Sequence, residues 1–590
     1  MSLSMLKAYD NFIKLATKKV SKNSEDFLGL KKEISGQLQL PLPTNADLRE
    51  HYEKMIKVKK IKRNIKFEEI MQSRKIRTQS GVAIVAVLTK EYPCPGKCLY
   101  CPTEKGMPKS YLSNEPAVMR AIASKFNPYK QVQNRLRSLE LNGHKTDKIE
   151  LIVMGGTFSY LPKNYQLKFI TECFRAANDY SVRSGPTAFG HSSRERSDRY
   201  LSLLHEQNRN EKTKHRIVGL TLETRPDYIN GEEILNFRKL GCTRVELGVQ
   251  SIFDDVLKIN KRGHAVAETI RATKLLKDAG FKINYHIMPG LPGSSLKKDY
   301  QMFQKLFSNP SFQPDMLKIY PTVVVKNSAL YNFWKRGTYK PLTDKQFEKF
   351  ILEVKNKIIP PYVRISRLVR DVPATSIVAG PTISNLRQMI AGKSSCRCIR
   401  CREVGADYKI NDLPAMLRCL KKNDKSNILS HSTKKVLTKS DIAMQAGKII
   451  LDRIDYPASD GKEIFLQYVS PDKPARGRGT RPRKKLFALL RLRIPGNQKS
   501  ALIREVHTYG KLKSINTKGK KSLPASLREA LQAGPQHIGL GKKLMQEAER
   551  IAKTEFGLNK ITVISGVGVR GYYRKLGYKL KDTYMTKTFI

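Results

Sequence analysis

The stretch Tyr92-Pro-Cys-Pro-Gly-Lys-Cys-Leu-Tyr-Cys-Pro102 places Cys94, Cys98 and Cys101 in the spacing C-x3-C-x2-C. Cysteine thiolates are the usual ligands of iron–sulfur clusters, and three of them can hold a four-iron cluster while its fourth iron stays open. An open iron can chelate S-adenosylmethionine (SAM) and pass it an electron, which releases a 5′-deoxyadenosyl radical. A structural zinc site, which would need a fourth ligand, and a disulfide are the alternatives that the spacing leaves open.

The cysteine stretch follows directly on an apolar run from Val82 to Leu88 that is typical of a buried strand. Further runs of strand length occur at 149–154, 217–223, 244–249 and 282–288, and helical stretches such as 265–279 separate them. Alternating strands and helices predict parallel βαβ units, and α/β barrels hold their active sites at the carboxyl ends of the strands. The sequence therefore predicts a partial barrel with the cysteine loop at that end. The polar stretch 181–215 is expected to be a surface insertion.

The charge of the chain indicates a polyanionic partner. Its 590 residues include 110 Lys and Arg against 52 Asp and Glu, a formal net charge of +58. Such an excess is self-repelling unless a polyanion shares the surface, and nucleic acid is the usual one. A basic bias common to the proteins of the source lineage is the competing explanation.

Two segments concentrate this charge. Residues 1–80 are lysine-rich and helix-periodic, and Lys59, Lys60, Lys62 and Arg63 are the predicted RNA contacts, with a solvated helix face as the alternative. Residues 473–485 are basic and rich in Pro and Gly, which predicts a mobile loop that touches RNA.

The cysteine count and the first ten residues indicate the cellular compartment. Nine cysteines form no even secreted framework, which predicts a reducing compartment. The segment Met1 to Asp10 has no apolar signal core, and no run is long enough to span a bilayer. We therefore expect a soluble cytoplasmic protein without a membrane partner.

A second cysteine group, Cys396, Cys398 and Cys401, has the tight spacing C-x-C-x2-C in the connector 376–440. Three thiolates so close together favour a zinc knuckle. Cys419 and His431 are candidates for the fourth ligand, and reduced thiols without a metal are the alternative.

The last 150 residues contain two glycine motifs. Gln536-His-Ile-Gly-Leu-Gly541 opens a predicted helix at 542–553, and Gly566-Val-Gly-Val-Arg-Gly-Tyr-Tyr-Arg-Lys-Leu-Gly-Tyr578 follows downstream. Glycines let backbone N–H groups approach a pyrophosphate, and a helix N-terminus favours its charge. Together the motifs resemble the acetyl-CoA fold of GNAT acetyltransferases. Ordinary aromatic packing is the alternative for Tyr572 and Tyr573.

A radical-SAM barrel followed by a GNAT domain resembles the elongator protein three family, which includes the catalytic subunit of Elongator and stand-alone bacterial and archaeal enzymes. The resemblance runs from about residue 60 to the end and is carried by 143–158, 222–227, 245–251, 286–293, 504–510 and 564–568. It implies an α/β multidomain fold with a basic helical tRNA-binding region (1–80), a radical-SAM domain (81–375), the cysteine-containing connector (376–440) and a GNAT domain (441–590).

The resemblance also implies an activity, an acyltransferase that builds the carboxymethyl group on C5 of the wobble uridine (U34) of tRNA. The adenosyl radical would take a hydrogen from the methyl group of acetyl-CoA, the carbon radical would add to C5, and thioester hydrolysis would release CoA. The implied partners are tRNA, acetyl-CoA and an electron donor. By motif, the implied catalytic residues are Lys148, Tyr572 and Tyr573, and the implied acetyl-CoA contacts are Lys148, Glu505, Val506, His507, Thr508, Gly539, Leu540, Gly541, Lys542 and Tyr573.

The chain departs from the family pattern in two places. Eukaryotic members separate the first two cysteines further, so the short spacing favours a stand-alone prokaryotic enzyme. Residues 102–106 replace the paired glycines that commonly follow the last cysteine, which bears on loop geometry but not on the ligands.

Two other function classes compete with tRNA carboxymethylation. A protein lysine acetyltransferase with the barrel as scaffold would need a base for the incoming amine, for which Glu505 and His507 are candidates. A tRNA-binding scaffold explains the charge but gives neither cofactor motif a purpose.

Overall fold

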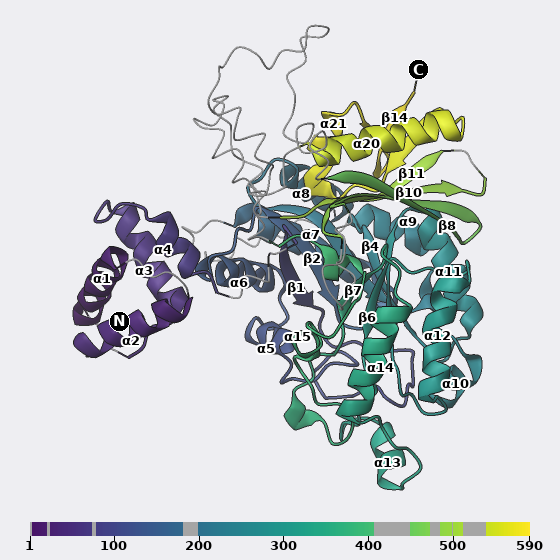
Figure 1. Cartoon of the computed structure of the whole chain (residues 1–590), viewed down its shortest axis with the longest axis horizontal. Helices are drawn as coiled ribbons and strands as arrows, with labels where there is room; N and C mark the ends of the chain where they lie inside the picture. The colour runs from purple at the N-terminus through teal and green to yellow at the C-terminus, as the bar shows by residue number, and fades with distance from the viewer. Residues whose placement is uncertain are drawn as a thin grey trace.

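The computed structural model describes residues 3–19, 24–39, 41–73, 78, 80–180, 199–405, 449–471, 484–497, 500–510 and 539–589. They form a helical bundle, a parallel sheet with outer helices and a second, mixed sheet (Figure 1). Four features that the sequence singled out lie outside these residues: Cys419, His431, the first half of the glycine motif at 536–538, and 473–483 of the basic loop.

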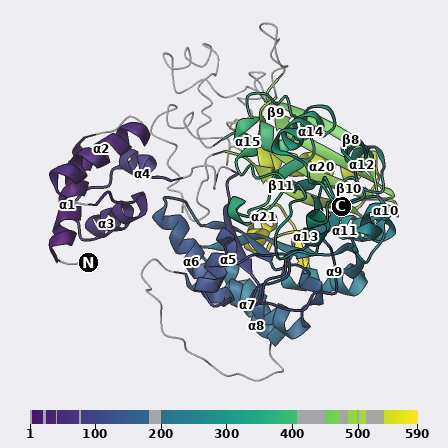
Figure 2. The ribbon, with the colours of Figure 1, turned by 90° about the horizontal axis from the view of Figure 1, so that it is seen from below.

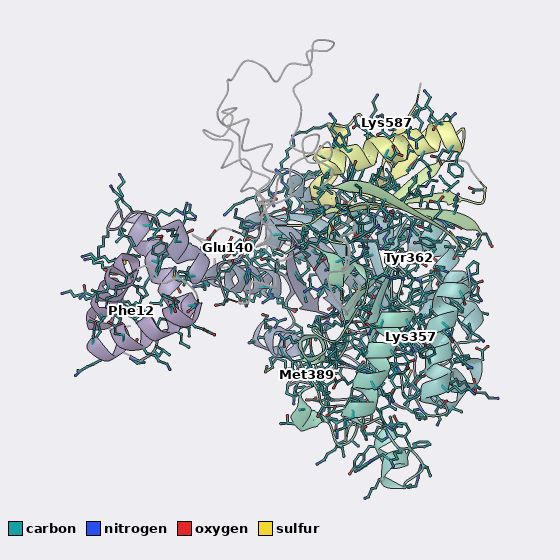
Figure 3. All side chains as sticks on the ribbon, viewed as in Figure 1. Phe12, Glu140, Lys357, Tyr362, Met389 and Lys587 are labelled. Carbon is teal, nitrogen blue, oxygen red and sulfur yellow. The ribbon has the colours of Figure 1, made fainter. Side chains whose placement is uncertain are left out.

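The N-terminal bundle has its own core. Phe12, labelled in Figure 3, is fully buried among apolar side chains of all four helices, and Thr44 closes the start of the third helix with a capping box. Both views place the bundle beside the rest of the molecule, where Glu50 pairs with Arg137 at 3.7 Å (Figures 1 and 2). Its elements are α1 (Leu3–Lys18), α2 (Ser24–Gln37), α3 (Asn45–Lys57) and α4 (Ile65–Ile70).

The central sheet is parallel throughout, and its strands pair in sequence order. On the second strand Ile149, Leu151 and Val153 are buried among the apolar core residues, while Lys148 and Glu150 face the interior of the barrel. Because the first and last strands do not pair, the barrel is partial, as predicted. The strands are β1 (Ala83–Leu88), β2 (Lys148–Met154), β3 (Arg216–Thr224), β4 (Arg244–Gln250), β5 (Lys282–Ile287), β6 (Met316–Ile319) and β7 (Arg364–Arg367).

Helices cover the outside of this sheet (Figure 2). One of them lies within the stretch 181–215, for which a surface insertion was predicted, because residues 199–210 form a helix that packs on the preceding one. Leu203 and Asn210 are fully buried, and Asn178 of the preceding helix bonds Glu206, so a polar stretch carries one buried face. The outer helices are α6 (Pro128–Leu141), α7 (Lys163–Asp179), α8 (Arg199–Asn210), α9 (Gly231–Leu240), α11 (Val266–Asp278), α12 (Leu296–Ser308) and α14 (Asp344–Lys357).

The second sheet has the strand order β13-β14-β12-β11-β10-β9-β8. All neighbouring pairs are antiparallel except β11 and β12, which pair only over Ala501 to Ile503. Beyond that point the two strands separate, and Glu505 to Thr508 line a cavity. The strands are β8 (Ile450–Ala458), β9 (Gly461–Val469), β10 (Leu486–Pro495), β11 (Ala501–Thr508), β12 (Lys560–Val563), β13 (Lys579–Lys581) and β14 (Tyr584–Thr588), with the helices α20 (Leu540–Arg550) and α21 (Arg570–Arg574).

Buried contacts join the barrel to the second sheet. Tyr362 stacks on Tyr456 with 3.9 Å between ring centroids, and Tyr362 lies between the two layers in Figure 3. Arg504 donates to Asp315 at 2.5 Å and to Glu463 at 2.9 Å, and all three side chains are fully buried. Breaking such a pair would leave an uncompensated buried charge, so this network fixes the two sheets in one arrangement.

Candidate active site

The cysteine loop lies at the carboxyl end of β1, as predicted. Cys98 is buried, and Cys94 and Cys101 are half-buried. The backbone around them is tied to distant segments, with Leu99 bonded to Asn260 and Leu330. Residues that each bind a different iron need not converge on one point, and the three sulfur atoms do not all lie within 4.8 Å of one another.

The surroundings of this loop fit a negatively charged group. Arg262 is buried and directs Nη1 to the Cys98 sulfur at 3.5 Å, and it forms no ion pair within the described ranges. Nε of Arg262 and Nη1 of Arg225 are also buried without a partner in that part of the chain. A Cβ on Gly96 would lie 2.3 Å from Arg225 Nη1, so the loop passes close over this guanidinium. Arg225 also pairs with Asp227 at 2.8 Å, so Arg262 is the buried cation here without a carboxylate in the described residues. Since unpaired buried charge is costly, a thiolate-bound iron–sulfur cluster suits this site.

A cavity of about 760 Å³ opens at the opposite end of the barrel, between the amino ends of its strands and the second sheet. The barrel contributes Lys148, Glu150, Arg216 and Lys282 to its wall. Every residue that the family resemblance implied for catalysis or acetyl-CoA binding also lines it: Lys148, Glu505, Val506, His507, Thr508, Gly539, Leu540, Gly541, Lys542, Tyr572 and Tyr573.

The N-terminus of α20 faces this cavity. Gly539 precedes the helix with φ of 98°, a left-handed conformation that glycine adopts without strain. A Cβ on Gly541 would come within 3.3 Å of the Tyr572 hydroxyl and 3.6 Å of Thr508. Unpaired backbone N–H groups at a helix start favour an anion such as a pyrophosphate.

The glycines of the second motif, 566–578, allow close packing against the barrel. A Cβ on Gly566 would lie 2.1 Å from the Val218 carbonyl oxygen, and one on Gly568 would lie 2.6 Å from the Cβ of Arg216. Both glycines therefore let this turn pack against β3. The motif joins the two sheets and brings Tyr572 and Tyr573, which follow it, to the cavity wall.

Charges in the cavity are arranged around Glu505. Its carboxylate accepts hydrogen bonds from Lys282 at 3.2 Å and Arg491 at 2.9 Å. Burial would raise the pKa of Glu505, but these two cations hold it far below its usual range. Burial lowers the pKa of Lys148 and that of His507, and it raises the pKa of Tyr572 to about 12.

A chain of polar side chains runs through the barrel between its two ends. Glu150 of the cavity pairs with Arg244, which lies 3.9 Å from Glu246. His286 then bridges Glu246 at 3.0 Å and Glu223 at 3.7 Å. Glu223 accepts a hydrogen bond at 2.7 Å from Tyr111, a residue of the segment that follows Cys101. Barrel interiors are usually filled by branched apolar residues. The charged interior of this barrel departs from that rule.

The connector cysteines form a compact group. Cys396, Cys398 and Cys401 place their sulfur atoms within 4.8 Å of one another, and they are the one such group of potential metal ligands in the described part of the chain. Three sulfurs bound to one zinc at ~2.3 Å would lie about 3.8 Å apart, which this arrangement approaches. The same segment reaches the second sheet, because Glu403 bridges to Leu486 and pairs with Arg364 at 2.6 Å.

The predicted RNA contacts do not lie on a helix as expected. Lys59, Lys60, Lys62 and Arg63 are exposed in the connection between α3 and α4. Lys60 pairs with Asp10 at 3.0 Å and Arg63 with Glu68 at 2.8 Å. Lys59 and Lys62 form no ion pair with any residue that the structure describes.

Comparisons with known proteins match the barrel and most of the remaining chain. Residues 93–305 match the Radical SAM superfamily, and residues 314–394 match the Radical_SAM C-terminal domain. The chain is 43% identical over 536 residues to the tRNA uridine(34) acetyltransferase of Methanocaldococcus infernus, with 88% of each chain covered. It is 35% identical over 537 residues to Elongator complex protein 3 of Homo sapiens, covering 88% of this chain and 86% of that one. The chain belongs to the family that includes the tRNA uridine(34) acetyltransferases and Elongator complex protein 3.

The family assignment extends to the three-dimensional structure. The archaeal Methanocaldococcus infernus Elp3 with an N-terminal deletion (1–46) superposes with a TM-score of 0.64 at 40% identity and covers 87% of this chain and 100% of that one. The predicted family and fold class, a partial radical-SAM barrel joined to a second α/β domain, are therefore confirmed. None of the helices in the described ranges is long and apolar enough to cross a membrane.

Sequence reasoning missed several residues of the site. Arg262, Ser80 and Lys282 were not singled out, and the interior residues Glu246 and His286 stood within matched segments without an assigned role. A charged residue inside an apolar strand pattern was the available signal for Lys282, Glu246 and His286. No signal of spacing or pattern marked Ser80, which meets the cavity only through the tertiary fold.

Proposed function

We propose that this protein modifies the wobble uridine of tRNA at C5, using acetyl-CoA to supply a carboxymethyl group and SAM radical chemistry to activate it. The observation that carries the proposal is the shared cavity, in which Lys148 of the barrel and Tyr573 of the second domain line one space. The printed names of the relatives, tRNA uridine(34) acetyltransferase and Elongator complex protein 3, support the same substrate.

Each end of the barrel has its own task in this proposal. Cys94, Cys98 and Cys101 would hold a four-iron cluster, which together with SAM would supply the radical chemistry. Arg262 and Arg225 balance negative charge at that end. The backbone around Gly539 to Lys542 binds the CoA pyrophosphate, while Lys148 and Tyr573 hold the thioester end. The buried contacts between the two sheets hold the two halves of this cavity in a fixed arrangement.

We assign tRNA binding to the basic N-terminal helices, with Lys59 and Lys62 as phosphate contacts. The proposed regions are those of the sequence analysis, the tRNA-binding 1–80, the radical-SAM domain 81–375, the connector 376–440 and the GNAT-like domain 441–590. For Cys396, Cys398 and Cys401 we propose a structural zinc ion, which would stabilise the link from α14 and β7 to β10.

The test uses acetyl-CoA labelled with ¹³C on both acetyl carbons. The reconstituted protein is incubated with SAM, a reductant and unmodified tRNA, and the tRNA nucleosides are analysed by mass spectrometry. We expect a carboxymethylated uridine that carries both labelled carbons and requires SAM. A label found on protein lysines instead, independent of SAM, would favour the lysine acetyltransferase alternative and overturn the proposal.

A further inference from the structure

His507 occupies a special place in the shared cavity. It lies on β11 just beyond the point where that strand parts from β12, and it lines the cavity. Its Nε2 atom lies 2.7 Å from the backbone carbonyl oxygen of Ser80. A carbonyl oxygen only accepts hydrogen bonds, so Nε2 carries the hydrogen and Nδ1 of the neutral ring keeps a lone pair. Tyr509 packs against the ring at 4.4 Å between centroids and holds its plane.

The other acid–base groups of the cavity are engaged or protonated. Glu505 accepts from both Lys282 and Arg491, and Glu150 pairs with Arg244. Burial raises the pKa of the Tyr572 and Tyr573 hydroxyls, which therefore remain protonated at neutral pH. Among the described residues that line the cavity, His507 is the one histidine, and its imidazole offers a basic nitrogen suited to accept a proton near pH 7.

We propose that Nδ1 of His507 is the general base that activates water for hydrolysis of the CoA thioester. This rests on the proposed function, because that hydrolysis ends the transfer. Water loses a proton to Nδ1 as its oxygen bonds the thioester carbonyl carbon. The tetrahedral intermediate then collapses, the carbon–sulfur bond breaks, and the proton passes from Nδ1 to the CoA sulfur. The products are the free thiol and the carboxymethyl acid, which ionises to solvent.

The charges around His507 suit this role. Burial lowers its pKa, and the Lys282 and Arg364 cations act in the same direction, so the ring is neutral before it reacts. Glu505 and the Ser80 carbonyl oppose that shift and stabilise the imidazolium that forms. Lys148 and Lys282 line the same cavity, and their positive charge offsets the negative charge that develops on the carbonyl oxygen.

The proposal predicts a specific failure in His507→Gln. Supplied with cluster, SAM, reductant, acetyl-CoA and tRNA, this variant should still form the carbon–carbon bond but should release CoA roughly 10²–10⁴-fold more slowly. tRNA that carries an unhydrolysed CoA thioester on the uridine should accumulate and be visible by mass spectrometry. In the wild type, CoA release should fall as the pH drops through the lowered pKa of His507, and this limb should vanish in the variant. A purely structural role would produce neither the adduct nor the altered pH profile.

His215→Gln is the matched control. His215 is buried and bonds the Thr146 carbonyl oxygen at 3.1 Å, but it does not line the cavity, so hydrolysis should keep its wild-type pH profile. Acetyl-CoA affinity, measured by calorimetry, separates the two proposals. If the wild type does not bind acetyl-CoA, the proposed function fails and the inference with it. If His507→Gln binds acetyl-CoA normally and still hydrolyses the thioester at the wild-type rate, the base assignment alone is wrong.

Discussion

At the carboxyl ends of its strands the barrel holds three cysteines beside two buried guanidinium groups, while at the amino ends it opens into the cavity shared with the second sheet. The amino face of such a barrel usually serves stability alone. Here a second domain covers that face and turns Lys148 and Lys282, which begin β2 and β5, into cavity residues. A face without a function in an isolated barrel thus becomes the wall of a cavity when another sheet closes over it.

Polar side chains in the barrel interior connect its two ends. The polar chain from Glu150 through Arg244, Glu246 and His286 to Glu223 spans the interior between them. In the proposed function the reaction uses groups at both ends. The comparison therefore predicts that variants at each end impair separable steps.

The largest effect is expected at the cysteine end. Cys94→Ala, Cys98→Ala or Cys101→Ala should each abolish the four-iron spectrum of the reconstituted protein and SAM cleavage to 5′-deoxyadenosine, because each removes one of three ligands. Acetyl-CoA affinity should not change, since the cavity lies at the other end. Cys242→Ala, at a fully buried thiol just before β4, is the control and should keep cluster and cleavage. Normal SAM cleavage by the triple variant would refute the ligand assignment.

The next effect is expected at the cavity end. Lys148→Ala and Tyr573→Phe should slow tRNA-dependent CoA release by roughly 10²–10³-fold, the usual cost of removing one positioned donor, while the cluster spectrum stays intact. Tyr578→Phe serves as the control, because this buried tyrosine bonds Glu549 at 2.9 Å and does not line the cavity. Undiminished CoA release in both cavity variants would show that acetyl-CoA does not bridge the barrel and the second domain at this site.

The interior chain gives a stability prediction. Burial would raise the pKa of Glu246, but Lys318 and His286 hold it well below its usual range. Glu246→Gln leaves the half-buried Lys318 without its carboxylate and should lower the free energy of unfolding by about 3–5 kcal/mol at pH 7, measured by denaturant titration. Because the folded pKa is depressed, the difference from wild type should shrink as the pH falls below about 4.3.

A surface pair tests whether burial causes that cost. Asp255 pairs with Lys298 but is well exposed. Asp255→Asn should therefore change the free energy of unfolding by less than about 1 kcal/mol. An equal loss in the two variants would mean that the interior charges contribute nothing beyond a surface ion pair.

The smallest effect is expected from the N-terminal bundle. It should bind tRNA for the steps at both ends of the barrel. Lys59→Ala and Lys62→Ala should each make the slope of log affinity against log salt shallower by roughly 0.7–0.9 for tRNA. Lys60→Ala and Arg63→Ala should change it less, because Asp10 and Glu68 already neutralise these side chains. Binding assays at four salt concentrations would measure the slopes, and an equal change in all four variants would contradict the role of these ion pairs.

Local sequence patterns predicted much of the barrel and of the cavity wall. The buried runs at 149–154 and 244–249 became β2 and β4, because alternation and β-branched residues are local signals. The helix of residues 199–210 was missed because its apolar side is narrow and the stretch around it is polar. Strands as short as β6 and β12, with four residues each, offer too little pattern to recognise.

The sequence by itself determined the local motifs of this protein, since the spacing of Cys94, Cys98 and Cys101 predicts cluster ligands and the glycines before α20 set the backbone shape over a few residues. Only the tertiary structure decided that Lys148 and Tyr573 share a cavity, that Gly566 serves the packing of the turn on β3, and that Ser80 sets the tautomer of His507. These facts depend on contacts between residues hundreds of positions apart. Such contacts follow from the packing of whole layers, which no local pattern contains.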